Sequence, residues 1–289
     1  MSKLSIGTVQ FGLNYGVANN AGKVPFDEVQ KILKEAKVNH IDTIDTAAAY
    51  GNSEEVLGKS NVENFQIITK LSEIPPDVKN VSAYIEKSFF NSLKRLNVNK
   101  VYGFLLHRPS QLFMDGGSEI YEALLNLKKQ GYIKKIGASV YQTEELDDIY
   151  KEYELDLIQL PFNIIDRRLI ETGWLSKLNG KGVEVHARSV FLQGLLLMPH
   201  KLRPDKFKQW NHLWGKWNNW LLENNLTPLE ASIRYVLSIP EISKVVIGVD
   251  STSQLKEIIS AANGTLPEIP SDIFSDDVNL LNPANWNNL

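Results

Sequence analysis

Several features that the sequence lacks narrow the class of protein that it can encode. There is no cysteine among its 289 residues, which excludes disulfides and thiolate metal sites and removes any need for an oxidising compartment. The 31 basic and 34 acidic residues nearly balance at a net charge of -3, so charge gives no reason to expect a nucleic-acid or membrane partner. The longest apolar runs, such as residues 195–198, are far too short to span a bilayer, and the N-terminus turns polar too early for a signal peptide. We therefore expect a soluble, cytoplasmic protein.

A glycine-rich dinucleotide-binding fingerprint is also missing after the first apolar run. Residues 7–12 read Gly-Thr-Val-Gln-Phe-Gly, and this spacing differs from that of Gly-x-Gly-x-x-Gly. A nucleotide cofactor would have to be held in another way. No proline- or glycine-rich linker divides the chain, so we interpret residues 1–289 as one domain, with residues 265–289 as a polar C-terminal tail.

Eight short apolar runs with the composition of β-strands recur along the chain, at residues 4–9, 40–44, 66–69, 101–106, 133–138, 155–160, 183–187 and 244–248. Amphipathic helical patterns lie between successive runs, as where Val29, Ile32 and Leu33 recur at three-to-four spacing. Strands that alternate with helices indicate a parallel sheet, and eight such units indicate that the sheet closes on itself. The sequence therefore predicts an α/β fold, a single (β/α)8 TIM barrel.

The interval between the seventh and eighth runs is about twice as long as the others, which predicts an enlarged loop and an extra helix there. In a barrel the loops that follow the strands surround the mouth, so residues 190–205 are a candidate lid or pocket wall. We expect the tail to lie on the surface, where it could cover part of the mouth. Five apolar residues of the extra helix share one face and are expected to pack against the barrel rather than bind a ligand: Trp210, Leu213, Trp214, Trp217 and Leu221.

Four polar side chains follow the second, third and fourth runs, at or near the point where each ends. They are Asp45, Tyr50, Lys70 and His107. The carboxyl ends of parallel strands meet at one mouth of a barrel, so these side chains are expected to lie close together. They form the main candidate for a catalytic site, and their types suggest no metal.

The segment around the first two of these residues resembles the aldo-keto reductase family. Residues 45–58 carry the pattern Asp-Thr-Ala-x-x-Tyr-Gly-x-Ser-Glu-x-x-Leu-Gly, followed by Lys70 and His107, and the similarity extends from about residue 6 to about residue 262. The resemblance implies a (β/α)8 barrel that transfers a hydride between NADPH or NADH and an aldehyde, ketone or keto sugar. Residues 186–194 resemble a bacterial branch that is often associated with surface-sugar metabolism.

Carbonyl reduction needs a group that both protonates the oxygen and polarises it. The Tyr50 phenol can do both, but its ordinary pKa near 10 is high, and a Lys70 ammonium beside it would lower that pKa. Asp45 would keep a buried Lys70 charged. His107 could donate a hydrogen bond to the carbonyl oxygen and orient it.

The resemblance also implies residues that hold the cofactor. Ser139 and Gln159 would bind the nicotinamide carboxamide, and residues 189–195, including Ser189, Gln193 and Gly194, would follow the pyrophosphate. Many family members have an aromatic residue stacked on the nicotinamide where this chain has Arg188. An arginine plane can stack on such a ring, and a structural pair with Glu184 is an equally open role for it.

The adenosine end departs from the family pattern as well. Members that prefer NADPH usually place basic residues where this chain has Gly248 and Gln254. Asp250, in the same loop, would repel a 2′-phosphate and could accept a hydrogen bond from a free 2′-hydroxyl. Ser251, with the two hydroxyl residues after it and Lys256, could still bind a phosphate. Because the basic residues are missing and Asp250 is acidic, we predict appreciable use of NADH.

Two other classes of function stay open at this point. One is a cofactor-binding regulatory subunit with little turnover, as some family members are. The other is a Schiff-base aldolase with Lys70 as its nucleophile, because barrels also host such lysines. Asp45 argues against the aldolase, since a Schiff-base lysine must become neutral.

Overall fold

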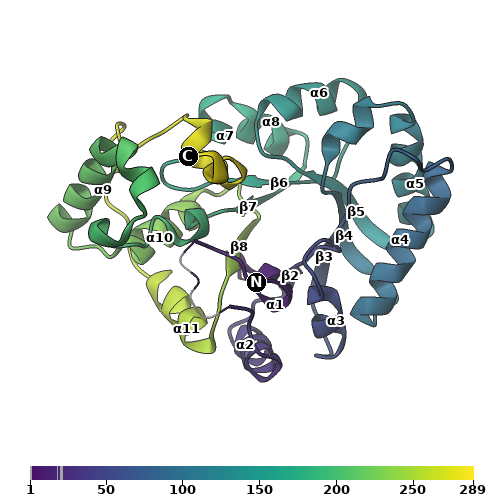
Figure 1. The fold of residues 1–289 in the computed structure, drawn as a ribbon, viewed down its shortest axis with the longest axis horizontal. Coiled ribbons are helices and arrows are strands. Elements are labelled where there is room, and N and C mark those ends of the chain that lie inside the picture. Colours follow the sequence, from purple (N-terminus) through teal and green to yellow (C-terminus); the bar gives the residue numbers. More distant parts are fainter. Residues whose placement is uncertain (1, 18, 20–21) are drawn as a thin grey trace.

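Eight parallel strands close into a barrel in the computed structural model, which describes residues 2–17, 19 and 22–289. Neighbours follow sequence order, and β8 pairs with β1, where Ile6 faces Ile247 in the register. The expected (β/α)8 architecture is therefore confirmed (Figure 1). The strands are β1 (Leu4–Gly7), β2 (Thr43–Asp45), β3 (Gln66–Leu71), β4 (Val101–Leu106), β5 (Ile133–Ser139), β6 (Leu157–Pro161), β7 (Glu184–Arg188) and β8 (Lys244–Gly248).

Helices surround the barrel, and α2 lies beside α11, so that the ring of helices closes where the chain's first and last barrel units meet (Figure 1). The α-helices are α1 (Val9–Gly12), α2 (Phe26–Val38), α3 (Ser53–Gly58), α4 (Val81–Leu96), α5 (Gly117–Lys129), α6 (Glu144–Glu152), α7 (Arg168–Glu171), α8 (Trp174–Gly180), α9 (Asn211–Glu223), α10 (Pro228–Ser238), α11 (Thr252–Ala261) and α12 (Val278–Leu281). Short 3-10 helices are η1 (Pro109–Phe113), η2 (Leu192–Gly194), η3 (His200–Leu202), η4 (Asp205–Trp210) and η5 (Pro283–Asn288). Among the described residues, no helix is long and apolar enough to cross a membrane.

The second strand is shorter than the sequence predicts, and it begins at Thr43 rather than at residue 40. His40 has a φ of 57°, and the N–H of Ile41 donates to the carbonyl of Ala36. This is the left-handed turn with which helices commonly end, so residues 40–42 complete the exit from α2 before the strand starts. The apolar pattern gave no sign of where turn changes to strand.

The extra segment between β7 and β8 contains η2, η3, η4, α9 and α10, as the long interval predicts. Within α9, Trp214 and Trp217 are at most 1% exposed, so their packing role is confirmed. Trp210 is only half-buried but also packs against the core, with its ring centroid 6.1 Å from that of Phe207, and its indole N–H donates to Asp277 in the tail at 2.9 Å. Helix α10 begins with a capping box, in which Thr227 and Glu230 cap each other's backbone N–H groups.

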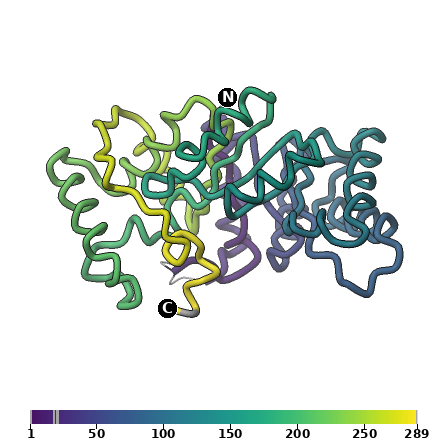
Figure 2. Tube along the Cα trace, turned by 90° about the horizontal axis from the view of Figure 1, so that it is seen from above, coloured from purple at the N-terminus to yellow at the C-terminus, as the bar shows by residue number. Residues whose placement is uncertain are grey.

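The C-terminal tail is anchored rather than simply laid on the surface. Its apolar side chains Ile273, Leu280 and Trp286 are at most 3% exposed. Trp286 packs edge-on against Phe207 of η4, with ring centroids 4.8 Å apart. The yellow tail in Figures 1 and 2 accordingly runs back between α9 and the barrel. The surface expectation for residues 265–289 is wrong for these side chains, which bury apolar area against the inserted segment.

Candidate active site

The four polar side chains singled out in the sequence meet at the carboxyl-terminal mouth of the barrel. Asp45 is the last residue of β2, Lys70 lies in β3, and His107 directly follows β4. Tyr50 lies in the loop between β2 and α3, and this loop packs closely on α1 because Gly12 has no side chain. A Cβ at Gly12 would collide with the backbone oxygen of Tyr50. The second and third βα units thus bring one phenol, one amine and one carboxylate together.

Asp45 and Lys70 form a buried ion pair. The Lys70 Nζ lies 2.7 Å from Asp45 Oδ2 and 2.9 Å from Oδ1, and it also donates to the carbonyl of Thr46 at 3.0 Å. Burial alone would lower the pKa of Lys70, but the Asp45 charge and the Tyr50 oxygen reverse this and raise that pKa above its ordinary value. Lys70 is therefore a fixed cation, and a buried pair of this kind needs every such partner to offset its desolvation.

The Lys70 ammonium also donates to the phenol oxygen of Tyr50, at 3.3 Å. Because the lysine donates, the phenol keeps its own proton free for another acceptor. Burial raises the pKa of Tyr50 above its ordinary value, and the charge of Lys70 offsets only part of this increase. Lys70 thus acts on the pKa of Tyr50 in the expected direction, but the net pKa lies above its ordinary value because the cost of burying a phenolate is larger than the stabilisation by the ammonium.

His107 lies against Tyr50, with ring centroids 5.9 Å apart and planes 81° apart. Burial lowers the pKa of its imidazole to about 4, and the nearby Lys70 charge contributes to the shift. His107 is therefore neutral around pH 7 and has one ring N–H to donate. Both the phenol and the imidazole line the same cavity.

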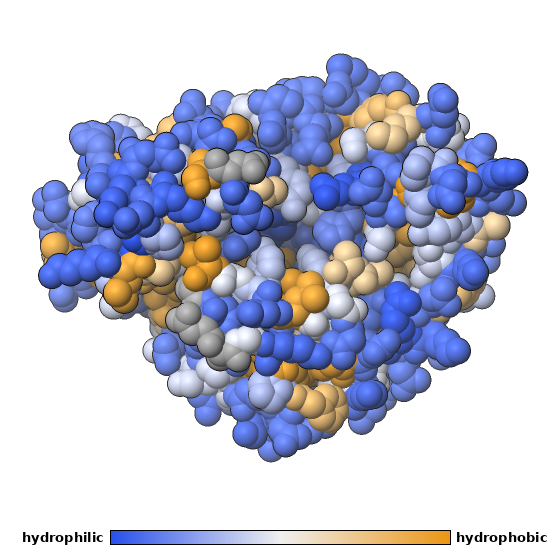
Figure 3. Space-filling view, viewed as in Figure 1, coloured by the Kyte–Doolittle hydropathy of each residue, from blue (hydrophilic) through white to orange (hydrophobic). Residues whose placement is uncertain are grey.

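The cavity extends from these two rings to the start of α11 and has a volume of about 490 Å³. It opens near the middle of the face shown in Figure 3, where the surface is hollowed. No described residue beyond Ile258 lines it, so the tail forms no part of the cavity wall. Eleven of the predicted site residues line it: Asp45, Tyr50, His107, Ser139, Arg188, Ser189, Gln193, Gly194, Gly248, Asp250 and Gln254.

The other three predicted site residues, Lys70, Gln159 and Ser251, do not line the cavity. Gln159 is fully buried, and its Nε2 donates to Asp45 Oδ1 at 2.6 Å, while its Oε1 accepts from Ser139 Oγ at 3.4 Å. Ser251 is the N-cap of α11 and accepts from the Gln254 N–H. Gln159 therefore links Ser139, on the cavity wall, to the buried ion pair.

Arg188 does not pair with Glu184, which bonds instead to His186, Lys135 and Tyr102. Its guanidinium stacks on Tyr141 with 4.3 Å from Cζ to the ring centroid, and Nη2 donates to the carbonyl of Val140 at 3.0 Å. The proposed structural pair is thus wrong, and the arginine lines the cavity. Its buried Nε has no partner among the described residues.

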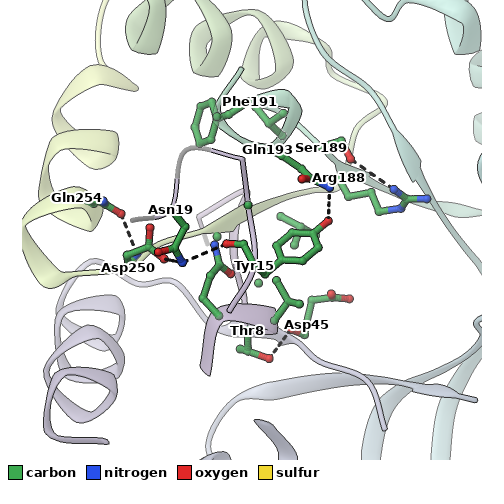
Figure 4. Close-up of a pocket in the computed structure, with 18 of the residues that line it drawn as sticks. Thr8, Tyr15, Asn19, Asp45, Arg188, Ser189, Phe191, Gln193, Asp250 and Gln254 are labelled. Atoms are coloured by element: carbon green, nitrogen blue, oxygen red, sulfur yellow. Dashed lines mark hydrogen bonds between the residues drawn. The ribbon is translucent and has the colours of Figure 1, made fainter. Parts of the chain in front are cut away.

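The loop after β7 has an unusual backbone. Ser189, Leu192 and Gln193 have φ values of 58°, 47° and 53°, a region that costs non-glycine residues free energy. The Asn163 side-chain amide holds the carbonyl of Ser189 at 3.0 Å, and Gln193 donates to the Tyr15 hydroxyl at 2.9 Å across the cavity. Figure 4 shows this contact between the loops after β1 and β7.

At the α11 end, the Asp250 carboxylate accepts from Asn19 at 3.4 Å, and its backbone N–H donates to Gln254 at 2.7 Å (Figure 4). Gly248 lets the wall approach Gln10, since a Cβ there would collide with the Gln10 amide. Gln10 Oε1 is buried at the cavity wall without a partner among the described residues. An elongated cavity with orphaned polar atoms at its wall and a volume typical of ligand sites fits a dinucleotide.

Several cavity residues were not found from the sequence. Thr8, Gln10, Tyr15 and Tyr141 line the cavity, and the first three come from the segment directly after β1. Their signal was present, because residues that follow a barrel strand face the mouth.

Comparison with known proteins agrees with this geometry. The profile of the Aldo/keto reductase family matches residues 3–270, and the chain belongs to this family of NAD(P)H-dependent oxidoreductases. It is 28% identical over 254 residues to the uncharacterized oxidoreductase YqkF of Bacillus subtilis, covering 80% of this chain and 81% of that one. It is 25% identical over 279 residues to the NADH-specific methylglyoxal reductase of Escherichia coli, covering 84% and 85%.

Solved structures show the same fold. The holo form of aldo-keto reductase AKR11C1 from Bacillus halodurans superposes with a TM-score of 0.74 at 22% identity, covering 94% of this chain and 90% of that one. At this identity the likeness supports the (β/α)8 barrel and no finer property.

Proposed function

We propose that this protein reduces small carbonyl compounds with Tyr50 as the proton donor. The observation that carries the proposal is the Lys70 to Tyr50 hydrogen bond, which leaves the phenol proton free for an acceptor in the cavity. The carbonyl oxygen of a substrate is such an acceptor. The raised pKa of Tyr50 keeps the phenol protonated throughout the neutral range.

His107 and Lys70 support the same oxygen from two directions. The neutral imidazole donates a second hydrogen bond to the carbonyl, which orients it and stabilises the negative charge that develops there. Lys70 stabilises the phenolate that forms when Tyr50 gives up its proton, and Asp45 keeps Lys70 in place. Gln159 acts through Asp45 as a positioning residue.

The nicotinamide cofactor, when bound, supplies the hydride that the carbonyl carbon accepts. Ser139 and Arg188 would hold its reactive end, the backbone of residues 189–194 its diphosphate, and Asp250 and Gln254 its adenosine. Asp250 disfavours a 2′-phosphate and can accept from a 2′-hydroxyl, so we propose that NADH is used. The name of the NADH-specific methylglyoxal reductase relative points the same way.

Two alternatives are less well supported by the site. A Schiff-base aldolase needs a neutral lysine, whereas Asp45 and Tyr50 raise the pKa of Lys70. A regulatory subunit would have no use for a phenol, ammonium and imidazole arranged around one acceptor position. Small 2-oxoaldehydes such as methylglyoxal are the first substrates to examine, since a relative acts on one.

The direct test follows oxidation of NADH and NADPH with methylglyoxal, simple aldehydes, keto sugars and keto acids. We expect turnover with at least one carbonyl class and loss of that turnover in Tyr50→Phe. Cofactor binding without turnover of any carbonyl would favour the regulatory alternative. Trapping of a carbonyl ligand on Lys70 by borohydride would favour the aldolase.

A further inference from the structure

The first turn of α11 already holds carboxylates that belong to the chain itself. Glu28 of α2 accepts from both the backbone N–H and the hydroxyl of Thr252, each at 2.7 Å. Glu257 accepts from the Ser253 hydroxyl at 3.1 Å, and Ser251 caps the N–H of Gln254. The neutral donors that this turn could offer to a phosphate are therefore largely engaged.

This turn is the place where a phosphate is usually favoured. In barrels the loop after the eighth strand and the N-terminus of the helix beside it bind phosphates, because free N–H groups and the helix dipole attract anions. Here the Glu28 carboxylate takes that role. The hydrogen bonds from Thr252 hold the pKa of Glu28 below its usual range, so the carboxylate is charged at neutral pH.

Nearby cations do not neutralise the negative charge around the first turn of α11. Lys31 lies 3.2 Å from Glu28, and Lys256 lies 3.6 Å from Glu35, so both ammonium groups already have acidic partners. Both lysine side chains are more than 60% exposed, where water and salt screen their charge. Asp250, which lines the adenosine end of the cavity, adds a further negative charge.

We propose that Glu28, supported by Glu257 and Asp250, excludes a 2′-phosphate from the adenosine end of the cavity and so selects NADH over NADPH. This inference rests on the proposed function for the placement of adenosine at α11. NADH presents an uncharged 2′-hydroxyl there, whereas NADPH presents a phosphate with nearly two negative charges. Glu28 does not touch the cofactor in this account and acts through its charge and through its occupation of Thr252.

A purely structural role for Glu28 would be to tether α2 to α11. The tether and the charge can be separated with Glu28→Gln, because the glutamine oxygen still accepts from Thr252 while the charge is lost. Asp27→Asn is the matched control, since it removes one charge from the neighbouring position of α2 and leaves Thr252 untouched.

The probes are 5′-AMP and adenosine 2′,5′-bisphosphate, which differ only in the 2′-phosphate. We expect the wild type to bind 5′-AMP at least as tightly as the bisphosphate in calorimetric titrations. In Glu28→Gln the bisphosphate should bind about fivefold to tenfold more tightly, with 5′-AMP within about twofold, because one nearby like charge has been removed. Asp27→Asn should leave both dissociation constants within about twofold.

Ionic strength gives a test that needs no variant. If like charges repel the 2′-phosphate, raising the salt concentration should improve the affinity for the bisphosphate relative to 5′-AMP. At a cationic phosphate site, raising the salt concentration would instead weaken the affinity for the bisphosphate relative to 5′-AMP.

Three results would overturn the proposal. They are tighter binding of the bisphosphate than of 5′-AMP by the wild type, an unchanged ratio of bisphosphate affinity to 5′-AMP affinity in Glu28→Gln, or a decrease of that affinity ratio as the salt concentration rises. Failure of 5′-AMP to bind to the wild type would also contradict it. These measurements involve no turnover, so a protein that shows the expected ratio but reduces no carbonyl would contradict only the proposed function.

Discussion

Lys70 donates a hydrogen bond to the phenol oxygen of Tyr50 at 3.3 Å, and this direction of donation decides what the phenol can do. With its oxygen already accepting, the phenol can offer its proton to a carbonyl in the cavity. The same contact places a cation beside the phenolate that would remain. Proton donation and stabilisation of its product therefore depend on one pair of side chains.

Replacing Tyr50 with phenylalanine removes only the hydroxyl. We expect Tyr50→Phe to fold and bind cofactor but to lose kcat/KM by at least about 10²-fold, as is typical when a general acid is deleted. Tyr15→Phe is a suitable control, because it removes another hydroxyl from the same cavity and should cost less than about tenfold. Retention of more than about a tenth of wild-type kcat/KM by Tyr50→Phe, a loss under roughly 1.4 kcal/mol, would remove Tyr50 from the role.

The pH dependence of reduction should show no ionisation near 6.5. His107 has its pKa lowered to about 4, and Tyr50 has its pKa raised, so neither group changes charge between pH 5.5 and 8.5. We expect a flat kcat/KM over that interval. A transition near pH 6.5 that disappears in His107→Gln would contradict the assignment of a neutral imidazole.

The lowered pKa of His107 should also make the free energy of unfolding depend on pH. The folded state holds His107 neutral down to pH of about 4, whereas the unfolded state takes up a proton near 6.5. Unfolding therefore binds a proton between these values, and the free energy of unfolding should fall as pH falls through that window. Urea unfolding at several pH values would measure it, and His107→Gln should lack this component.

The buried ion pair should be costly to break from one side. Asp45→Asn leaves the Lys70 ammonium, which is 1% exposed, without its counter-charge, and we expect a loss of about 3 to 5 kcal/mol. A double variant, Asp45→Leu with Lys70→Met, should recover much of this loss while remaining inactive. Equal destabilisation in the single and double variants would show that packing, rather than charge, accounts for the loss.

The tryptophans of the inserted segment should divide into two groups. Trp214 is 1% exposed, and Trp214→Ala should cost about 3 to 5 kcal/mol, as large-to-small changes in a core do. Trp210 is half-buried, so its packing contribution is smaller, and Trp210→Ala, which also removes the bond to Asp277, should cost about 1 to 2 kcal/mol. A larger loss at Trp210 than at Trp214 would reverse this assignment.

The strands and the four polar side chains of the active site could be predicted because the sequence patterns that indicate them are local. An apolar run that ends on a charged residue, repeated at β2 and β3, can be recognised within a few residues of sequence. Other contacts around the site join residues that are far apart in the sequence. Glu28 meets Thr252 across 224 positions, Gln193 meets Tyr15 across 178, and Gln159 meets Asp45 across 114. Nothing near any of these residues indicates its partner.

The pKa values show a second limit of sequence reasoning. The positions of Tyr50 and Lys70 after neighbouring strands indicate correctly that the two side chains lie together. The ammonium does act to lower the pKa of the phenol. How strongly burial acts in the opposite direction depends on every group that keeps water away from Tyr50. Those groups come from several barrel units, so the net direction emerges only from the assembled mouth.

The left-handed residues of the loop after β7 have a consequence for the speed of binding. Since Asn163 and Gln193 already hold that backbone in its unfavourable conformation, its ordering cost is met when the chain folds. A dinucleotide would then meet a surface of fixed shape, and little conformational entropy would be lost on association. Capture of the cofactor should accordingly approach the rate of a rigid docking step.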